Sequence, residues 1–186
     1  MIRPAFRLLV FVFLISCALL PLRAQSTPEV YTGMLIAAEA VAGSGAGRIN
    51  IRVVSYTSEV ERKNLKEAFQ KSDADGLALL QTMSKGYINV EGQPGRKIYA
   101  VFSRPRKDGY ELVVVSEHVA SKLEQWRGTK AEEHPLAVVH LRLDNGGDPV
   151  SGEVFPAVKV SVTSDGFVDV QTNDSNKVTM HDLAKK

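Results

Sequence analysis

The fold of this chain is decided by Tyr110-Glu111-Leu112-Val113-Val114-Val115-Ser116, a run with apolar side chains at consecutive positions. The side chains of a β-strand point alternately to its two faces, so a strand of this composition must be covered on both sides. Immediately before it, Lys107-Asp108-Gly109 offers residue types that suit a tight hairpin turn. The run therefore predicts a central strand, and a helical hairpin is the candidate cover for one of its faces.

Outward from this run, apolar segments alternate with turn sequences rich in glycine, asparagine and aspartate. The turns lie at 92–95, 107–109, 145–147 and 164–166. Two strands, Glu29–Ala37 and Arg48–Tyr56, are predicted in the first third of the chain. The later predicted strands are Tyr87–Glu91, Ile98–Ser103, Tyr110–Ser116, Leu136–Leu143, Gly152–Thr163, Phe167–Thr172 and Lys177–His181. Consecutive strands joined by short turns imply an antiparallel meander.

A pair of helices is predicted after the second strand. Ser58 and Glu61 have the spacing of a capping box, and a partly apolar stripe follows as far as Lys71. Asp73 is placed to cap a second helix over Ala74–Ser84. We therefore expect an α+β fold, with a mainly antiparallel, strongly curved or barrel-like sheet of eight or nine strands and a helical hairpin inserted after the second strand. Residues 117–126 are left open as a third short helix.

The N-terminus has the pattern of a secretory signal peptide over residues 1–24. Met1–Arg7 carries two arginines and no acid, and the almost wholly apolar Leu8–Leu22 is too short for a membrane-spanning helix. We expect cleavage after Ala24 and no stable transmembrane anchor. Residues 25–186 then form a single secreted or periplasmic β-rich domain.

A lipid anchor is the competing interpretation of the same leader. Leu14-Ile15-Ser16-Cys17 resembles a lipobox, in which Cys17 would carry the lipid. The segment Ala18–Leu22 is apolar where a lipoprotein turns polar, so lipidation of Cys17 is the less favoured of the two.

Composition narrows the possible functions. The chain has 23 basic and 21 acidic residues, and removal of Arg3, Arg7 and Arg23 with the leader leaves a net charge near −1. This balance argues against nucleic acid as a partner. Cys17 is the only cysteine, so the mature domain has no thiol for disulfides, catalysis or metal binding.

The sequence offers weak candidates for a ligand site and none for catalysis, metals or cofactors. Arg104 and Arg106, beside Lys107, could grip an anionic ligand at a hairpin end, although a solvated turn explains them as well. His140 is a further candidate on its strand, but none of the four histidines, His118, His134, His140 and His181, has metal-site spacing on a helix. We therefore predict no catalytic residue, no metal ligand and no cofactor.

The acidic residues likewise identify no particular calcium or catalytic site. Segments 73–76 and 144–148 resemble fragments of calcium loops but lack the spaced oxygen ligands of a complete loop. Glu111 and Glu153 are two of many acids from which a glycosidase pair could be assembled. No Gly-x-Ser-x-Gly segment marks a serine hydrolase.

Several segments together resemble a family of uncharacterised secreted bacterial proteins. They are Tyr56-Thr57-Ser58 before the helices, Tyr99–Pro105 with Asp108-Gly109, His134–Val139 with Leu143-Asp144, and Phe155–Val160. The resemblance covers nearly the whole chain from Val30, but it implies no activity and no site residue. Residues 116–120 depart from the family pattern.

Two functional hypotheses follow. The first is an exported, non-catalytic domain that binds either a small apolar ligand, held inside the barrel if the sheet closes, or an envelope partner protein. The alternative is a secreted hydrolase with a site that sequence motifs do not reveal. Because thiol, metal and nucleophile-elbow motifs are lacking, binding without chemistry is the favoured hypothesis.

Overall fold

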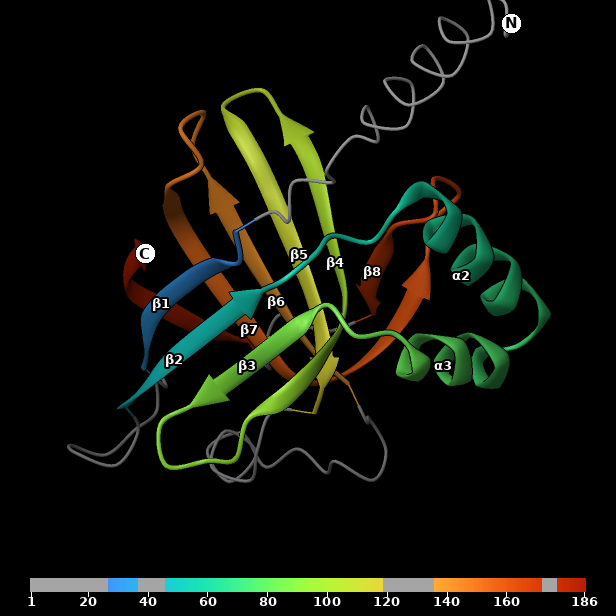
Figure 1. The fold of residues 1–186 in the computed structure, drawn as a ribbon, viewed down its shortest axis with the longest axis horizontal. Helices are drawn as coiled ribbons and strands as arrows, with labels where there is room; N and C mark the ends of the chain where they lie inside the picture. The colour runs from blue at the N-terminus through green and yellow to red at the C-terminus, as the bar shows by residue number, and fades with distance from the viewer. Residues whose placement is uncertain (1–26, 37–45, 119–135, 172–176) are drawn as a thin grey trace, which may run out of the picture.

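The computed structural model describes residues 27–36, 46–118, 136–171 and 177–186 (Figure 1). Within them, nine strands and two helices follow one another along the chain. They are β1 (Glu29–Ile36), β2 (Ala46–Val53), α2 (Glu59–Lys71), α3 (Asp73–Thr82), β3 (Gly86–Val90), β4 (Arg96–Arg106), β5 (Gly109–Glu117), β6 (Leu136–Leu143), β7 (Pro149–Val162), β8 (Val168–Gln171) and β9 (Val178–Lys185). The predicted α+β class and the helical hairpin after the second strand are confirmed.

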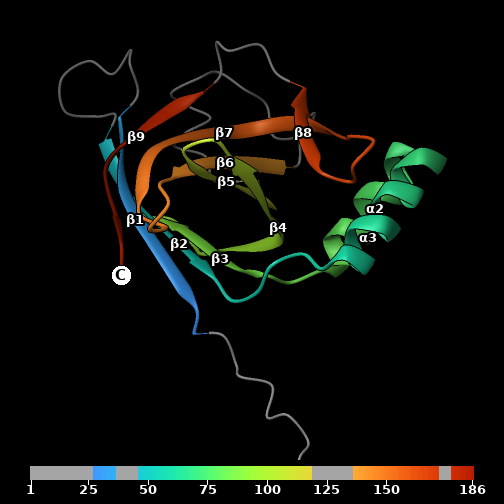
Figure 2. The same ribbon diagram turned by 90° about the horizontal axis from the view of Figure 1, so that it is seen from above.

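Eight of the strands close into an antiparallel barrel. Each of β1 to β7 pairs with the next strand around the wall, and β9 pairs with both β7 and β1 to complete the ring. The remaining strand, β8, pairs only with the second half of β7 and lies outside the ring. The ring and the helices beside it are seen from above in Figure 2. The sheet that was predicted to be curved or closed is therefore closed.

The inside of the barrel is an apolar core built by the alternation of each strand. In β2, for example, Ile49, Ile51 and Val53 are buried while Asn50 and Arg52 are exposed. The buried inward-facing side chains form one cluster: Tyr31, Leu35, Ile49, Ile51, Val53, Ile88, Val90, Ile98, Val101, Leu112, Val114, Ala137, Val139, Leu141, Leu143, Val154, Val178 and Met180. An eight-stranded barrel is just wide enough to be filled by side chains or to hold one small ligand.

Met180 occupies space that two glycines leave inside the barrel. A Cβ on Gly152 would come within 2.9 Å of Met180 Sδ and of Leu141 Cδ2. A Cβ on Gly33 would come within 3.1 Å of Met180 Cε and 3.0 Å of Leu183 Cδ2. The flexible thioether side chain therefore fills the space that the absent side chains of Gly33 and Gly152 leave.

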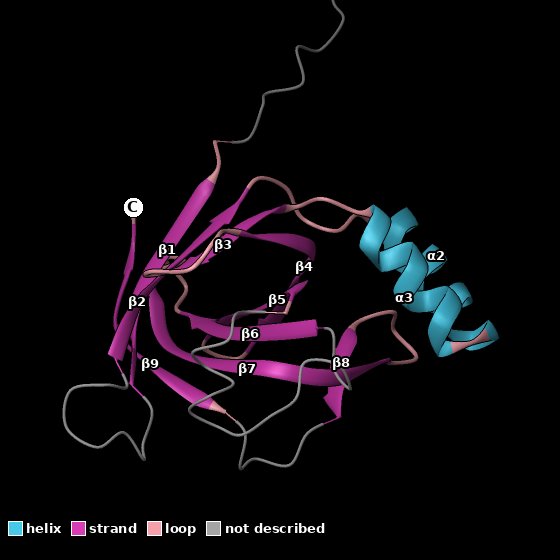
Figure 3. Ribbon diagram, turned by 90° about the horizontal axis from the view of Figure 1, so that it is seen from below, coloured by secondary structure: helices cyan, strands magenta, loops and turns pink. Residues whose placement is uncertain are grey.

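The central strand β5 is buried on both faces, as its sequence predicted. Leu112 and Val114 face the barrel interior, whereas Val113 and Val115 belong to a second apolar cluster on the outer wall. This outer cluster also contains Leu65 of α2, Leu80 of α3, Val158 and Val160 of β7 and Val168 of β8. The helical hairpin therefore shares the covering of β5 with β7 and β8, and Figure 3 shows both helices on that side of the barrel.

The helices begin where small polar residues can cap them. Ser58 and Glu61 form the predicted capping box: the Glu61 N–H donates to Ser58 Oγ at 3.3 Å, and Glu61 Oε2 accepts from the Ser58 N–H at 2.8 Å. The predicted cap of the second helix was wrong by one residue. Ser72 Oγ accepts from the Asp75 N–H at 3.0 Å, and Asp73 is already the first helical residue. Serine at this position satisfies the same free backbone donor that Asp73 was expected to cap.

Some predictions fall outside the described residues. They include the leader with Ala24 and Cys17, His134, and most of the optional helix over 117–126; its first residue, Glu117, is in β5. Among the residues that the structure does describe, no helix is both long and apolar enough to cross a membrane.

Candidate functional site

The three candidate residues lie on neighbouring strands of the barrel's outer wall. Pairing places Arg104 of β4 opposite Glu111 of β5, and His140 of β6 opposite Glu153 of β7. His140 and Glu111 are close in space, because the Nδ1 of the imidazole lies 3.7 Å from a Glu111 carboxylate oxygen. Sequence alone gave no reason to choose Glu111 and Glu153 from the other acids, and the structure brings both toward His140.

The two arginines have different partners within this group. The Arg106 guanidinium lies 3.3 Å from Glu111. The Arg104 guanidinium stacks over the Phe167 ring at 4.6 Å and donates to the Val168 carbonyl at 3.1 Å. Lys107 is exposed in the turn between β4 and β5. The cationic groups that were expected to grip one anion are therefore engaged separately.

His140 is held as a neutral side chain on this wall. Burial lowers its pKa, and this effect exceeds the opposing influence of Glu111 and Glu153. The Phe155 ring packs edge-on against the imidazole at a centroid distance of 5.4 Å, and the buried Nε2 has no hydrogen-bond partner. None of the described hydroxyl groups donates to His140, so this histidine forms no Ser-His or Thr-His pair of the kind that nucleophilic catalysis uses.

A second polar cluster, which sequence reasoning missed, lies at one end of the barrel. The start of β1 and the end of β9 meet at this end, together with the β4–β5 and β6–β7 hairpins (Figure 1). We call this end of the barrel the barrel mouth. Glu29 Oε2 accepts hydrogen bonds from Tyr31 at 2.9 Å and from Tyr56 at 2.5 Å, and Lys185 Nζ lies 3.3 Å from Glu29 Oε1.

These contacts fix the protonation states at the mouth. Burial raises the pKa of Glu29, but the hydrogen bonds from Tyr56 and Tyr31 and the Lys185 charge outweigh it, so this pKa lies below the ordinary value. Burial and the hydrogen bond to Glu29 raise the pKa of both Tyr31 and Tyr56 above the ordinary phenol value. The mouth thus carries an ionised carboxylate and two permanently protonated phenols at neutral pH.

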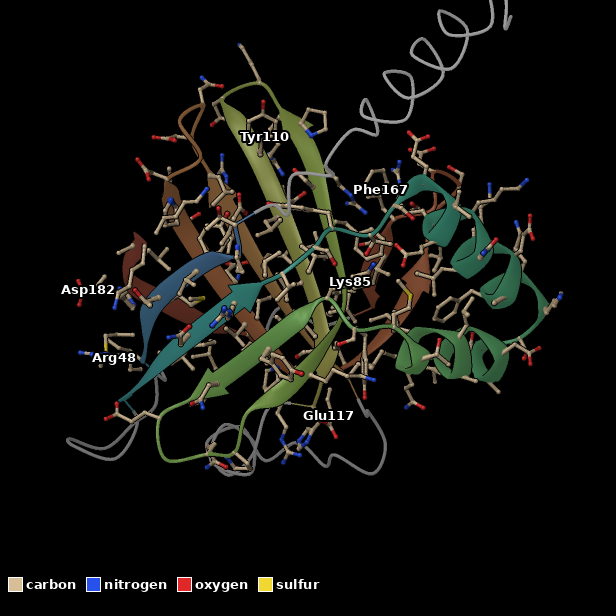
Figure 4. All side chains as sticks on the ribbon, viewed as in Figure 1. Arg48, Lys85, Tyr110, Glu117, Phe167 and Asp182 are labelled. Atoms are coloured by element: carbon tan, nitrogen blue, oxygen red, sulfur yellow. The ribbon has the colours of Figure 1, made fainter. Side chains whose placement is uncertain are left out.

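Across the barrel mouth from the Glu29 cluster, one aromatic side chain is exposed to solvent. Tyr110 pairs with Leu143, and cross-strand partners share a face of the sheet, so both lie on the inner side of the wall. Leu143 belongs to the interior cluster, whereas Tyr110 at the end of the barrel is 44% exposed. Figure 4 shows Tyr110 beside the β4–β5 hairpin. Its ring is therefore partly exposed to solvent at the end of the apolar barrel.

The acidic turn segments have structural partners. Asp144 Oδ1 accepts hydrogen bonds from the N–H groups of Gly146 and Asp148 at 2.8 and 2.9 Å, which stabilises the β6–β7 turn. Asp73 forms an ion pair with Lys159 at 3.1 Å. Among the described residues, no three His, Asp or Glu side chains are grouped so that they could hold a metal ion.

The fold and this geometry define a class, an up-and-down antiparallel barrel of eight strands with an added strand and a helical hairpin on one flank. Comparison with family models, curated proteins and solved structures finds no match for this chain.

Proposed function

We propose that this protein is an exported, non-catalytic domain that binds a small apolar ligand through the barrel mouth. The observation that carries the proposal is the position of Tyr110, an exposed aromatic side chain on the inner face at the end of an apolar barrel. Barrel mouths are frequent sites for small ligands, because an apolar interior meets a few polar groups there. The signal-like leader and the resemblance to secreted bacterial proteins support export.

The interior supports the same proposal through Met180. Its side chain fills the space beside Gly33 and Gly152, and methionine changes rotamer more easily than branched side chains do. Movement of Met180 would open an apolar space between two glycines without displacing the backbone.

The hydrolase alternative has weaker support. His140 is neutral and close to two carboxylates, but its Nε2 is buried and has no partner. The Arg106 ion pair further engages Glu111. A hydrolytic site would need a nucleophile or an activated water within hydrogen-bond reach of the base.

The test is binding of a fluorescent fatty acid, 11-(dansylamino)undecanoic acid, to the purified mature domain. We expect saturable binding with a blue-shifted emission and roughly tenfold weaker affinity in Tyr110→Arg, which places a charge at the apolar entrance. Tyr87→Arg is the matched control: Tyr87 is similarly exposed, at 58%, but lies on the outer face of β3, so its affinity should equal that of the wild type.

Three results would contradict the proposal. The wild type could fail to bind the probe, both tyrosine variants could lose affinity equally, or the domain could turn over ester or glycoside substrates with an activity that His140→Gln abolishes. The last result would establish the hydrolase in place of the binding domain.

A further inference from the structure

A second surface, distinct from the mouth, lies on the outer wall formed by β1, β2, β3 and β4. The strand register aligns Arg52 of β2 with Tyr87 of β3, and Tyr87 with Lys97 of β4, so these three side chains form one row across the sheet. In the next row, Asn50 of β2 pairs with Asn89 of β3. Their neighbours Ile49, Ile51, Ile88 and Val90 are buried, which directs the polar residues outward.

The three cations Arg48, Arg52 and Lys97 of this wall have no acidic partner among the described residues. Within the described residues, Arg48, Arg52 and Lys97 form no ion pair, whereas Arg106, Arg142 and Lys85 elsewhere on the barrel are each paired with a carboxylate. The Glu91 carboxylate lies beside this wall and accepts a hydrogen bond from the Arg48 backbone N–H at 3.2 Å. A domain with a net charge near −1 thus places three unpaired cations on one wall.

The wall also carries an aromatic platform and amide groups. The Tyr87 side chain is 58% exposed, and Arg52 lies directly opposite it on β2. Lys97 Nζ lies 5.1 Å from the centre of the Tyr99 ring and donates to the Gln81 carbonyl at 2.8 Å. No described residue forms a hydrogen bond with the Asn50 or Asn89 side chain.

The helices lie at the β4 border of this wall, where Lys97 donates to the Gln81 carbonyl of α3, and they do not extend over β1, β2 or β3. In Figure 2 both helices lie to one side of the barrel, next to β4 and β8. The strands β1, β2 and β3 form a part of the ring that the helices do not cover. The same wall faces the viewer in Figure 4, where Arg48 is labelled at the edge of the sheet. Among the described residues, no helix lies over the row formed by Arg52 and Tyr87.

We propose that the outer wall of β1–β4 is a docking surface for an anionic polysaccharide. Arg52, Lys97 and Arg48 would bind carboxylate, phosphate or sulfate groups, for which guanidinium is particularly suited. The Tyr87 ring offers an apolar face to the C–H side of a sugar ring, and Asn50 and Asn89 offer both donors and acceptors to hydroxyl groups. The combination of three cations, one aromatic ring and one amide pair fits a chain that carries both charged groups and hydroxyls.

Other polyanions fit this wall less well. An anionic membrane would be held best by a dense basic cluster together with apolar side chains that insert into the bilayer, whereas this row has three cations and one exposed tyrosine. A nucleic acid would call for a higher density of phosphate contacts than three cations supply.

The experiment uses polygalacturonate as the anionic glycan and its fully methyl-esterified form as the neutral control. Affinity electrophoresis of the mature domain at low salt should show retardation by polygalacturonate only, and added NaCl should weaken it. The double variant Arg52→Gln with Lys97→Gln should bind about tenfold more weakly. Its matched control, Lys63→Gln with Arg142→Gln, removes two exposed cations from other faces and should bind as the wild type does.

Tyr87→Ala separates recognition of the sugar ring from attraction by charge. It leaves every cation in place and should still weaken binding several-fold. All variants should keep the wild-type thermal midpoint, because the substituted side chains are at the surface. Failure of the wild type to bind polygalacturonate would overturn the proposal. Equal losses in the two double variants, full binding by Tyr87→Ala, or tighter binding to vesicles of anionic phospholipid would also overturn it.

Discussion

At the scale of single residues, one carboxylate connects three parts of the barrel mouth. Glu29 begins β1, Tyr56 follows β2, and Lys185 ends β9, so their contacts join the first strand of the barrel to the last. Glu29 and Lys185 are 156 residues apart in the sequence, and no local pattern marks either of them as a partner of the other. Such a cluster follows from barrel closure, which is why sequence reasoning did not find it.

Glu29→Gln is expected to reduce the acid sensitivity of the domain. Because the folded pKa of Glu29 lies below the ordinary 4.5, the unfolded chain takes up this proton first as the pH falls. The contribution of Glu29 to the free energy of unfolding is therefore complete above about pH 5 and is lost as the pH falls through the folded pKa. Urea denaturation at about pH 7, 5 and 3.5 should show a shallower decline for the variant than for the wild type.

The control for this prediction is Glu67→Gln, which removes an exposed carboxylate of α2 that lies 4.0 Å from Lys63 and far from any tyrosine cluster. If the two variants changed the pH profile equally, the effect would come from net charge, and the role assigned to the mouth cluster would be wrong.

A second residue-scale prediction concerns the fit between Gly152 and Met180. Gly152→Ala should lower the free energy of unfolding by about 1–3 kcal/mol, because the new methyl group would meet Met180 Sδ and Leu141 Cδ2 at 2.9 Å. In the background of Met180→Ala the same substitution should cost at least about 1 kcal/mol less, since the Met180 sulfur is gone and only the Leu141 and Cβ contacts remain. Equal costs in both backgrounds, measured by urea denaturation, would contradict this packing.

At the scale of elements, turn chemistry and alternation predicted the strands well. All seven strands expected after residue 86 are present, and β6 has the bounds that its pattern predicted. The second helix cap was missed because Ser72 and Asp73 are both good capping residues, and which one caps depends on where the chain leaves α2. The pairing of Arg106 with Glu111, and the position of His140 beside it, depend on strand register, which the sequence does not specify.

Ser58→Ala tests the capping box that the sequence did predict. It removes the oxygen that accepts from the Glu61 N–H and should lower the free energy of unfolding by about 1 kcal/mol. The loss should exceed that of Ser103→Ala, an exposed strand serine with no side-chain hydrogen bond in the described structure. Chemical denaturation of both variants measures the difference. A loss no larger than that of Ser103→Ala would mean that Glu61 and Lys85, 2.7 Å apart, hold this helix end without the serine.

At the scale of the whole molecule, barrel closure and the distribution of charge over the surface could not be predicted from the sequence. A curved or closed sheet was expected. Which of the two forms depends on whether β9 pairs with β1 as well as with β7. Arg48, Arg52 and Lys97, which form no ion pair with a described residue, span 50 positions of the chain. The net charge of the chain gives no information about their position on one wall. Both features arise from pairings between distant segments.

Closure itself predicts that the last five residues stabilise the entire barrel. Ending the chain at His181 removes the Ala184 and Lys185 pairings with β1, the 2.9 Å hydrogen bond from the Lys186 N–H to the Val30 carbonyl, and the Leu183 contact with the core. We expect a loss of about 3 kcal/mol or more in the free energy of unfolding. Amide exchange should also accelerate in the first half of β1, which would lose its β9 partner.

The full-length variant Leu183→Ala with Lys185→Ala isolates the backbone contribution, because it removes the same side chains but keeps the β1–β9 pairing. It should lose less stability than the truncated chain and keep slow exchange in β1, since the ladder hydrogen bonds persist. If β1 exchanged equally fast in both proteins, side-chain packing alone would hold the seam. If truncation changed neither stability nor exchange, β9 would not be closing the ring.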